Sequence, residues 1–446
     1  MGELHELDKN HFLHPTSSIK QQQEEGAKFI FEEGDGIYLR DVEGRTYIDA
    51  MSSLWNVNVG HGRLELAEAA FEQMKKLAFS SAFSTFSHEP AIRLCAKLVS
   101  LAPGDLNAVF LTSGGSESTD TAVKLARHYW RLRGEAKRVK IISRKKAYHG
   151  VAAAATSATG IPEFWDMAGK LSDHFIHAEA PFEIGTAEAI ASVREQIESV
   201  GAHTVAAFIA EPVQGAGGVI IPPEDYFREI RRLCDEYGIL FIADEVITGF
   251  GRTGKMFAME HWNVVPDLMM FAKGVSSGYI PLGGVAVSEK IVRVLKERST
   301  TTLFHGFTYS GHPAAAAVGL KNIEIIEKEK LVEHSRRMGE RLLHGLKAMR
   351  DEIDIVGDVR AIGLLAAFEV VKDRGSYERF AAEKKAAPRI IEALYERGVI
   401  CRPVTYDGTA IVTLAPPLII TERQVEELVA KLTDAVKAVR KELVDA

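Results

Sequence analysis

The sequence predicts an α/β fold, because short apolar runs alternate with helical segments through the middle of the chain. Segments 116–133 and 224–237 carry apolar side chains at helical spacing, as Leu125, Tyr129 and Leu132 do. Strands that are apolar throughout and alternate with helices are typical of a parallel sheet covered on both faces. The apolar runs are residues 108–113, 140–144, 205–213, 238–246 and 268–274.

The two ends of the chain are predicted to form a smaller α/β domain together. Residues 36–49 alternate apolar and polar side chains around Gly44, which is the pattern of a hairpin. We therefore expect a large domain over residues 60–329 and a small domain made of residues 1–59 and 330–446.

The C-terminal part is predicted to mix helices with strands. A long helical stretch runs over roughly 313–350, an apolar run follows at 359–371, and a helix is expected at 384–397. The last helix, over roughly 421–443, begins with Thr-Glu-Arg-Gln, a capping-box sequence.

Composition and charge exclude several classes of protein. The net charge of −7 argues against a general nucleic-acid binder. Cys95, Cys234 and Cys401 form neither a disulfide framework nor a zinc motif, and we expect no metal site. No stretch approaches the roughly 18 uninterrupted apolar residues of a membrane-spanning helix. The first residues lack the apolar core of a signal peptide, so we expect a cytoplasmic protein with no membrane partner.

Three of the predicted strands end in residues suited to chemistry, and ligands of parallel sheets bind at such carboxyl ends. The first strand runs into TSGGSE (112–117) and then into a helix. Gly115 lets the backbone approach a ligand, and the helix N-terminus with the Ser113 and Ser116 hydroxyls suits a phosphate. Taken alone, a turn with a helix cap explains the segment equally well. It is not a Walker motif, because no Gly-Lys-Ser/Thr follows.

An acid and a lysine end two further strands. Asp244 follows an apolar run, and a carboxylate there can keep a cationic ring nitrogen protonated. Alone, such an acid is more often a metal ligand, a loop anchor or a solvated turn. Lys273 also follows an apolar run, and burial would give it a neutral amine that forms Schiff bases with aldehydes. By itself, a surface lysine is the simpler interpretation.

Together, these three strand ends supply the attachment points of one cofactor, pyridoxal 5'-phosphate. The segment 249–254 also matches GxGxxG, the dinucleotide fingerprint. It lies in the middle of the chain, is separated from its strand and precedes no clear helix start. We therefore interpret it as a glycine-rich active-site loop beside Asp244.

Over nearly its whole length the chain resembles the class III (omega) aminotransferases, which are fold-type I pyridoxal-phosphate enzymes. The resemblance implies a large domain with a mainly parallel seven-stranded sheet and a small α/β domain from both chain ends. The segments that carry it are GRTYIDAMSSLWNVNVGHGR (44–63), TSGGSES (112–118), AYHG (147–150), EPVQGAGG (211–218), ADEVITGFGRTG (243–254), FAKGVSSGYIPLGG (271–284) and HGFTYSGHP (305–313).

The resemblance assigns roles around the cofactor ring. Lys273 would hold the cofactor as a Schiff base and then move a proton as a catalytic residue. Asp244 would bind the ring nitrogen, Val246 would pack on one face of the ring and Tyr148 on the other. Tyr148 is otherwise an ordinary core aromatic.

The resemblance also implies ligands at the edge of the cofactor. Gly115 and Ser116 would hold the phosphate together with Thr308 from a neighbouring subunit, which implies a homodimer with shared active sites. Whether two dimers join as a tetramer stays open. Glu211 and Gln214 would lie near the polar edge of the ring, or else form a strand-end hydrogen-bond pair.

The segment SSGYIPLGG (276–284) and Trp55 look like the amine–pyruvate and β-alanine–pyruvate group, which narrows the expected substrates to those of that group. Ala216 replaces the second glutamate of ornithine- and GABA-type members. Trp55 would line the substrate pocket, or else be a buried structural tryptophan. Arg402 is the candidate for a mobile arginine that binds the keto-acid carboxylate, although its spacing to the Ala-Pro-Pro motif is longer than the family's; a solvated arginine is the alternative.

The expected reaction is a ping-pong transamination that moves an amino group from an amine or omega-amino acid to a keto acid, pyruvate first among them. The donors considered are β-alanine, an aliphatic diamine, taurine and an arylalkylamine. The alternative within the family is the adenosylmethionine-8-amino-7-oxononanoate aminotransferase of biotin synthesis. An isomerase, a racemase or a dialkylglycine-type decarboxylase would use the same framework, and a non-catalytic protein would normally lack Lys273.

Overall fold

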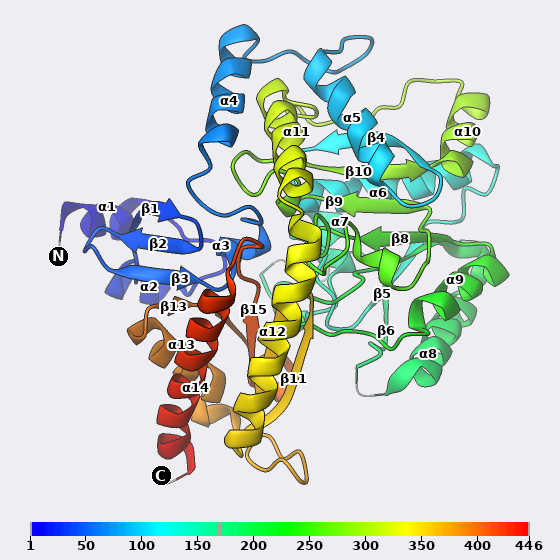
Figure 1. The fold of residues 1–446 in the computed structure, drawn as a ribbon. Helices are drawn as coiled ribbons and strands as arrows, with labels where there is room; N and C mark the ends of the chain where they lie inside the picture. The colour runs from blue at the N-terminus through cyan, green and yellow to red at the C-terminus, as the bar shows by residue number, and fades with distance from the viewer. Residues whose placement is uncertain (1, 168, 170–171, 183, 445–446) are drawn as a thin grey trace.

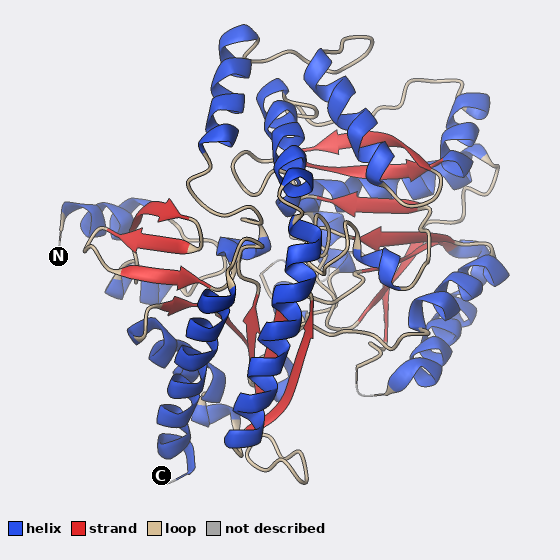
Figure 2. Ribbon diagram, viewed as in Figure 1, coloured by secondary structure: helices blue, strands red, loops and turns tan. Residues whose placement is uncertain are grey.

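Three β-sheets and the helices around them make up the computed structural model, which describes residues 2–167, 169, 172–182 and 184–444 (Figures 1 and 2). The central sheet has seven strands in the order β4-β10-β9-β8-β7-β5-β6. Two four-stranded sheets have the orders β1-β2-β3-β13 and β11-β12-β15-β14. In Figure 1 the seven-stranded sheet fills the right-hand part, and both chain termini lie at the left.

The seven-stranded sheet confirms the predicted fold class. β10 is antiparallel to its neighbours β4 and β9, and the other pairs are parallel. The sequence did not predict β6 and β10 individually, whereas the other strands coincide with predicted apolar runs. The strands are β4 (Leu106–Thr112), β5 (Lys140–Arg144), β6 (Phe175–Ala178), β7 (Val205–Ala210), β8 (Leu240–Asp244), β9 (Leu268–Phe271) and β10 (Gly283–Ser288).

Side chains of this sheet are buried on both of its faces. On β7, Ala207 and Ile209 belong to a core cluster that includes α6 and α10, whereas Phe208 and Ala210 belong to the cluster that includes α8 and α9. Alternation along a strand produces this division, because successive side chains point to opposite faces. The helices nearby are α6 (Gly115–Leu132), α7 (Ala153–Ala158), α8 (Gly185–Val200), α9 (Tyr226–Tyr237) and α10 (Glu289–Arg298).

The first small sheet joins residues from the two ends of the chain. β2 and β3 form the predicted antiparallel hairpin, and β13 pairs in parallel with β3. The division into residues 1–59, 60–329 and 330–446 remains a prediction. The elements here are α1 (Glu3–His11), α2 (Ile19–Glu25), β1 (Phe31–Asp35), β2 (Tyr38–Asp41), β3 (Thr46–Asp49), α3 (Ser52–Trp55) and β13 (Val399–Ile400).

The predicted helical stretch at 313–350 is two helices, α11 and α12. The chain breaks between them because Lys330 adopts a left-handed conformation with φ of 53°. The final helix begins as predicted, since Thr421 and Gln424 exchange side chain-to-backbone hydrogen bonds in a capping box. The elements are α11 (Pro313–Lys328), α12 (Leu331–Glu352), β11 (Val356–Ile362), β12 (Leu365–Val370), α13 (Ala386–Glu396), β14 (Arg402–Val404), β15 (Ile411–Leu414) and α14 (Glu422–Val444).

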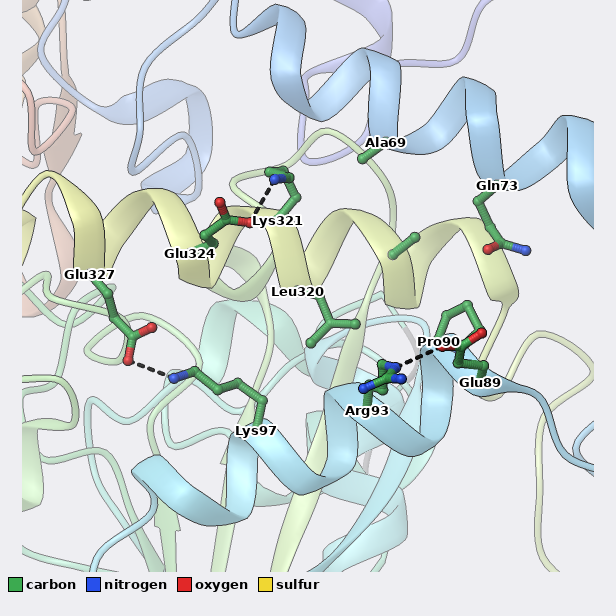
Figure 3. Close-up of a pocket in the computed structure, with 11 residues that line it drawn as sticks. Ala69, Gln73, Glu89, Pro90, Arg93, Lys97, Leu320, Lys321, Glu324 and Glu327 are labelled. Carbon is green, nitrogen blue, oxygen red and sulfur yellow. Dashed lines mark hydrogen bonds and ion pairs between the residues drawn. The ribbon is translucent and has the colours of Figure 1, made fainter.

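A surface groove lies between helices α4 (Leu64–Lys76), α5 (Glu89–Leu101) and α11 (Figure 3). Its charged side chains are largely paired with one another. Lys97 Nζ lies 2.7 Å from Glu327 Oε1 and so joins α5 to α11, while Arg93 pairs with Glu89 within α5. We interpret the groove as a helix junction held by ion pairs.

No helix among the described residues is both long and apolar enough to cross a membrane.

Candidate active site

Lys273 lies directly after β9, in the short 3-10 helix Lys273–Val275. Its φ is 46°, a left-handed conformation that costs a non-glycine residue about 1–3 kcal/mol and is concentrated at functional sites. Its Nζ forms no hydrogen bond or ion pair with any residue that the structure describes. Burial lowers the pKa of Lys273, and the negative charges of Asp244 and Glu211 only partly oppose this shift. A lowered pKa favours the neutral, nucleophilic form of this amine.

Asp244 ends β8, and its buried carboxylate is held on both oxygens. The Val246 N–H donates to Oδ1 at 3.1 Å, and Oδ2 lies 2.7 Å from His149 Nδ1. The sequence analysis missed His149, although it stands beside Tyr148 in the AYHG segment. Its imidazole fixes the orientation of the Asp244 carboxylate, and its Nε2 is buried without a partner among the described residues.

The N-terminus of α6 lies where the sequence predicts a phosphate site. The first N–H groups of a helix have no partner within the helix, and α6 begins at Gly115. A Cβ on Gly115 would stand 3.0 Å from Val246, and one on Gly150 would stand 2.4 Å from Ser116 Oγ. The two glycines therefore keep this corner of the site open. Ser113 Oγ is buried there without a hydrogen bond to a described residue.

Glu211 is buried beside the Tyr148 backbone. Its Oε1 accepts from the Tyr148 N–H at 2.9 Å, and its Oε2 accepts from the Gly215 N–H at 3.0 Å. Burial raises the pKa of Glu211 to about 7. Gln214 lies close by in sequence and donates to the Lys145 carbonyl at 2.9 Å, while its Oε1 is buried and unpaired among the described residues.

One cavity brings most of the predicted cofactor residues together, along with three that the sequence analysis did not single out: His149, Gly150 and Ile247. Gln214 does not line it, and Thr308 lies on an exposed segment outside it. The predicted residues that line this cavity are Gly115, Ser116, Tyr148, Glu211, Asp244, Val246 and Lys273.

Trp55 and Arg402 lie next to each other, beside this cavity and outside its lining. The Arg402 guanidinium stands 5.4 Å from the centre of the Trp55 ring. Its positive charge lowers the pKa of Lys273 and opposes the burial that raises the pKa of Tyr148. Arg402 forms no ion pair with a described carboxylate and is therefore available to an anion.

These residues fit pyridoxal phosphate. A helix N-terminus opened by glycines suits the phosphate, an anchored carboxylate suits the ring nitrogen, and an unpaired lysine suits the aldehyde.

Comparison with known proteins identifies the family. The Aminotransferase class-III family matches residues 19–436.

The chain belongs to the class-III aminotransferases.

Relatives of known name agree. The chain is 40% identical over 433 residues to the putrescine–pyruvate aminotransferase of Pseudomonas aeruginosa, covering 95% of this chain and 93% of that protein. A transaminase from the marine bacterium Virgibacillus is 63% identical with a TM-score of 0.98, over 99% of this chain and 100% of that one. The omega transaminase of Pseudomonas jessenii, solved in complex with PMP, is 37% identical with a TM-score of 0.95, over 99% of each chain. The protein is thus a pyridoxal-phosphate-dependent aminotransferase of fold type I with omega-transaminase relatives.

Glu245 is a buried carboxyl group whose effect on the pH dependence of stability can be measured. Its carboxyl group is fully buried, accepts from the Met259 N–H at 2.8 Å and contacts Thr248 Oγ1. Burial raises its pKa from 4.5 to about 7. The unfolded chain therefore loses this proton at a lower pH than the folded chain, so the contribution of Glu245 to stability is complete below pH 4.5 and is lost as pH rises through 7.

Glu245→Gln removes this dependence, because the amide can accept from Met259 and donate to Thr248. We expect the variant to gain on the order of 1–3 kcal/mol over the wild type between pH 5 and pH 8. Thermal or urea unfolding at both pH values measures the difference. A stability difference that does not change with pH would contradict the raised pKa.

Proposed function

We propose that the protein moves an amino group from an amine remote from a carboxylate, or lacking one, to a keto acid, foremost pyruvate. The two half-reactions follow each other at one site in a ping-pong sequence. The observation that carries the proposal is the unpaired Lys273 amine in one cavity with the anchored Asp244 carboxylate and the open N-terminus of α6.

Each residue of the site has a separate role in the proposed reaction. When bound, pyridoxal phosphate supplies the aldehyde that takes up the amino group and a ring that withdraws electrons from the substrate carbon. Lys273 Nζ would anchor the cofactor and then move a proton at the substrate carbon. Asp244, oriented by His149, would keep the ring nitrogen protonated. Tyr148 and Val246 would pack against the ring, and the N-terminus of α6 would hold the phosphate with Gly115 and Ser116.

The donor is an aliphatic diamine, β-alanine, taurine or an arylalkylamine. The similarity to an enzyme named putrescine–pyruvate aminotransferase supports a diamine and supports pyruvate as the acceptor. The adenosylmethionine-dependent reaction of biotin synthesis is not favoured by the relatives.

A visible spectrum of the purified protein tests the proposal. We expect a yellow absorbance that one of putrescine, β-alanine, taurine or 1-phenylethylamine bleaches and that pyruvate restores. Bleaching by S-adenosylmethionine alone would contradict the proposal in favour of the biotin reaction. A spectrum that no donor changes would contradict it altogether.

In the proposed reaction, Arg402 binds the carboxylate of the keto acid. A charge-assisted guanidinium–carboxylate contact contributes about 1.5–3 kcal/mol. We therefore expect Arg402→Ala to raise the KM for pyruvate by about 10- to 100-fold and to change the KM for putrescine little. Steady-state kinetics with each substrate varied in turn measures both values. Arg397→Ala is the matched control, because Arg397 pairs with Asp434 on the surface. Equal effects on both substrates would contradict the assignment.

We further propose a homodimer in which the partner subunit's Thr308 completes the phosphate site. Thr308 is exposed and lies outside its own chain's cavity. A hollow of about 920 Å³ nearby is lined by Phe83, Phe86 and Phe304, which are exposed apolar side chains suited to cover by a second copy. Light scattering during gel filtration distinguishes a dimer from a monomer.

A further inference from the structure

The turn that carries Trp55 is held in an unfavourable backbone conformation. Ser52, Ser53 and Trp55 have φ of 46°, 56° and 57°, in the left-handed region that non-glycine residues seldom adopt. Three such residues within four positions do not persist unless the surroundings impose the conformation.

Asp49 holds the turn from the end of β3. Its carboxylate is completely buried. Oδ1 accepts from the Met51 N–H at 3.2 Å, and Oδ2 accepts from the Ser53 N–H at 2.7 Å. His61 Nε2 lies 2.8 Å from the same Oδ2 and fixes the carboxylate from its other side. The backbone N–H groups on both sides of Ser52 are thus tied to one anion.

Arg252 holds the same turn from the opposite side. It comes from the glycine-rich segment 249–254 and is completely buried. Its Nη2 donates to Ser52 Oγ at 3.0 Å and to Asn58 Oδ1 at 2.9 Å. Its Nη1 donates to the backbone carbonyls of Leu364 and Pro416 at 3.0 and 2.6 Å.

Arg252 therefore ties the turn to segments that lie far away in sequence. Burial lowers the pKa of Arg252, and the negative charge of Asp49 opposes this shift. The turn is thus clamped between a buried anion and a buried cation.

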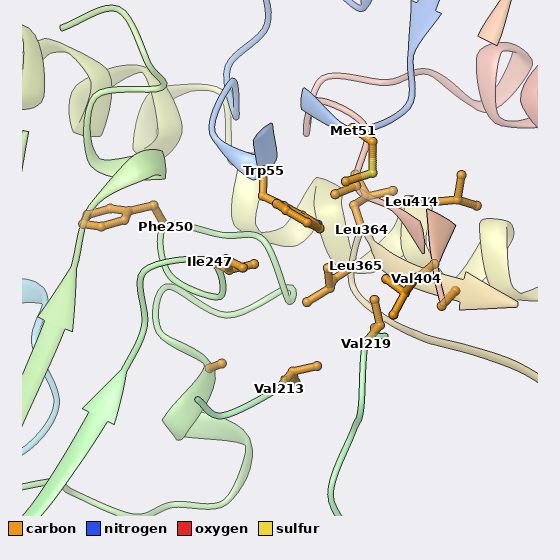
Figure 4. Packing of buried hydrophobic residues seen from close by; sticks show 14 of the residues in the cluster. Met51, Trp55, Val213, Val219, Ile247, Phe250, Leu364, Leu365, Val404 and Leu414 are labelled. Atoms are coloured by element: carbon orange, nitrogen blue, oxygen red, sulfur yellow. The ribbon is translucent and has the colours of Figure 1, made fainter. Parts of the chain in front are cut away.

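The clamp fixes where the Trp55 side chain stands. Figure 4 shows the Trp55 ring between Ile247 from the central part of the chain and Leu364 from the C-terminal part. The ring is 3% exposed, its Nε1 has no partner among the described residues, and Arg402 lies against it. Ile247 also lines the cavity of Lys273. A shift of the turn would move the ring relative to both Ile247 and Arg402.

We propose that Asp49 and Arg252 are positioning residues that set the place of the Trp55 indole and, through it, the size of the amine that the enzyme accepts. The inference rests on the proposed function and on the expectation, from the family resemblance, that Trp55 lines the substrate pocket. It also assigns a role to the segment 249–254, which carries Arg252 and so holds the turn of Trp55 in place.

A double-mutant cycle on the holoenzyme tests the proposal. The quantity measured is the ratio of kcat/KM for 1-phenylethylamine to kcat/KM for putrescine. We expect Trp55→Gly to raise this ratio by about tenfold or more, because a bulky donor gains room. Asp49→Asn and Arg252→Lys are each expected to raise this ratio as well. Once Trp55 is glycine, adding Asp49→Asn is expected to change the ratio no further.

Asp267→Asn is the matched control, because Asp267 is a buried carboxylate that pairs with Arg231 and Lys290 before the start of β9. It is expected to lower the melting temperature without changing the ratio. If Asp49→Asn does not yield folded protein, His61→Gln weakens the same clamp more mildly and takes its place in the cycle.

The outcomes separate the inference from the function it rests on. An unchanged ratio in Asp49→Asn and Arg252→Lys, with a raised ratio in Trp55→Gly, overturns the inference alone. An undiminished effect of Asp49→Asn in the Trp55→Gly background also overturns it, since Asp49 would then act by another route. An unchanged ratio in Trp55→Gly shows that Trp55 does not limit the size of the donor, which overturns the expected role of Trp55 and the inference with it, while the transaminase activity itself would still be seen with putrescine.

Discussion

Replacing Lys273 by alanine is expected to reduce turnover of every donor by at least about 10²- to 10⁴-fold, the contribution of a positioned acid–base group. In the proposed reaction, Lys273 is both the anchor of the cofactor and the amine that moves the proton, and the variant loses both. It should still fold, because Lys273 Nζ makes no hydrogen bond or ion pair with a described residue. Single-turnover kinetics and circular dichroism measure the two effects separately.

A lysine elsewhere in the chain provides the control for this loss. Lys290 pairs with the buried Asp267, the residue that precedes β9. Lys290→Ala is therefore expected to affect stability more than turnover. A Lys273→Ala variant with wild-type turnover would assign the chemistry to another residue. A variant that does not fold would show that Lys273 stabilises the chain, which its lack of partners argues against.

Asp244→Asn is expected to slow turnover by about 10²- to 10³-fold, which is typical for the loss of one electrostatic contact to a developing charge. The amide keeps the shape of the side chain and can still accept from the Val246 N–H. It loses the negative charge that, in the proposed reaction, keeps the ring nitrogen of the cofactor protonated. Pre-steady-state kinetics with putrescine and titration of the apoprotein with pyridoxal phosphate measure the change in rate and in affinity.

The neighbouring carboxyl group gives a closely matched control. Glu245 is as deeply buried as Asp244 but binds Thr248 and the Met259 N–H in place of His149. Glu245→Gln is therefore expected to leave turnover close to the wild-type value. Equal losses in the two variants would mean that Asp244 supports the fold of the strand end and not the cofactor.

The sequence predicted the strands that lie within clear apolar runs. β8 and β9 were recognisable in this way, and their ends pointed to Asp244 and Lys273. β6 has four residues, one of them a histidine, and β10 begins with two glycines, so neither carries a clear apolar pattern. The antiparallel direction of β10 depends on its two neighbours in the sheet, which no local pattern reveals.

The break between α11 and α12 was also hidden. It falls at Lys330, where neither glycine nor proline marks the left-handed conformation. Tertiary packing at the junction overrides the helical pattern of the sequence, as local propensities allow.

The residues of the site were likewise predicted only in part. Residues at strand ends were predicted from the sequence itself, whereas Trp55 and Arg402 were singled out only by the family resemblance, and their contact was not predicted. His149 was missed because a lone histidine beside a tyrosine is not distinctive until a carboxylate faces it. The contact between Arg252 and Ser52 joins residues 200 positions apart, and only the folded chain brings them together.

The covalent attachment of pyridoxal phosphate to Lys273 is the central claim, and trapping tests it most directly. Sodium borohydride reduces a Schiff base to a stable amine, so the reduced holoenzyme can be digested and its peptides analysed by mass spectrometry. We predict a pyridoxyl label on the peptide that contains Lys273 and on no other lysine. A label on a different lysine, or none on a protein that shows the yellow absorbance, would contradict the account.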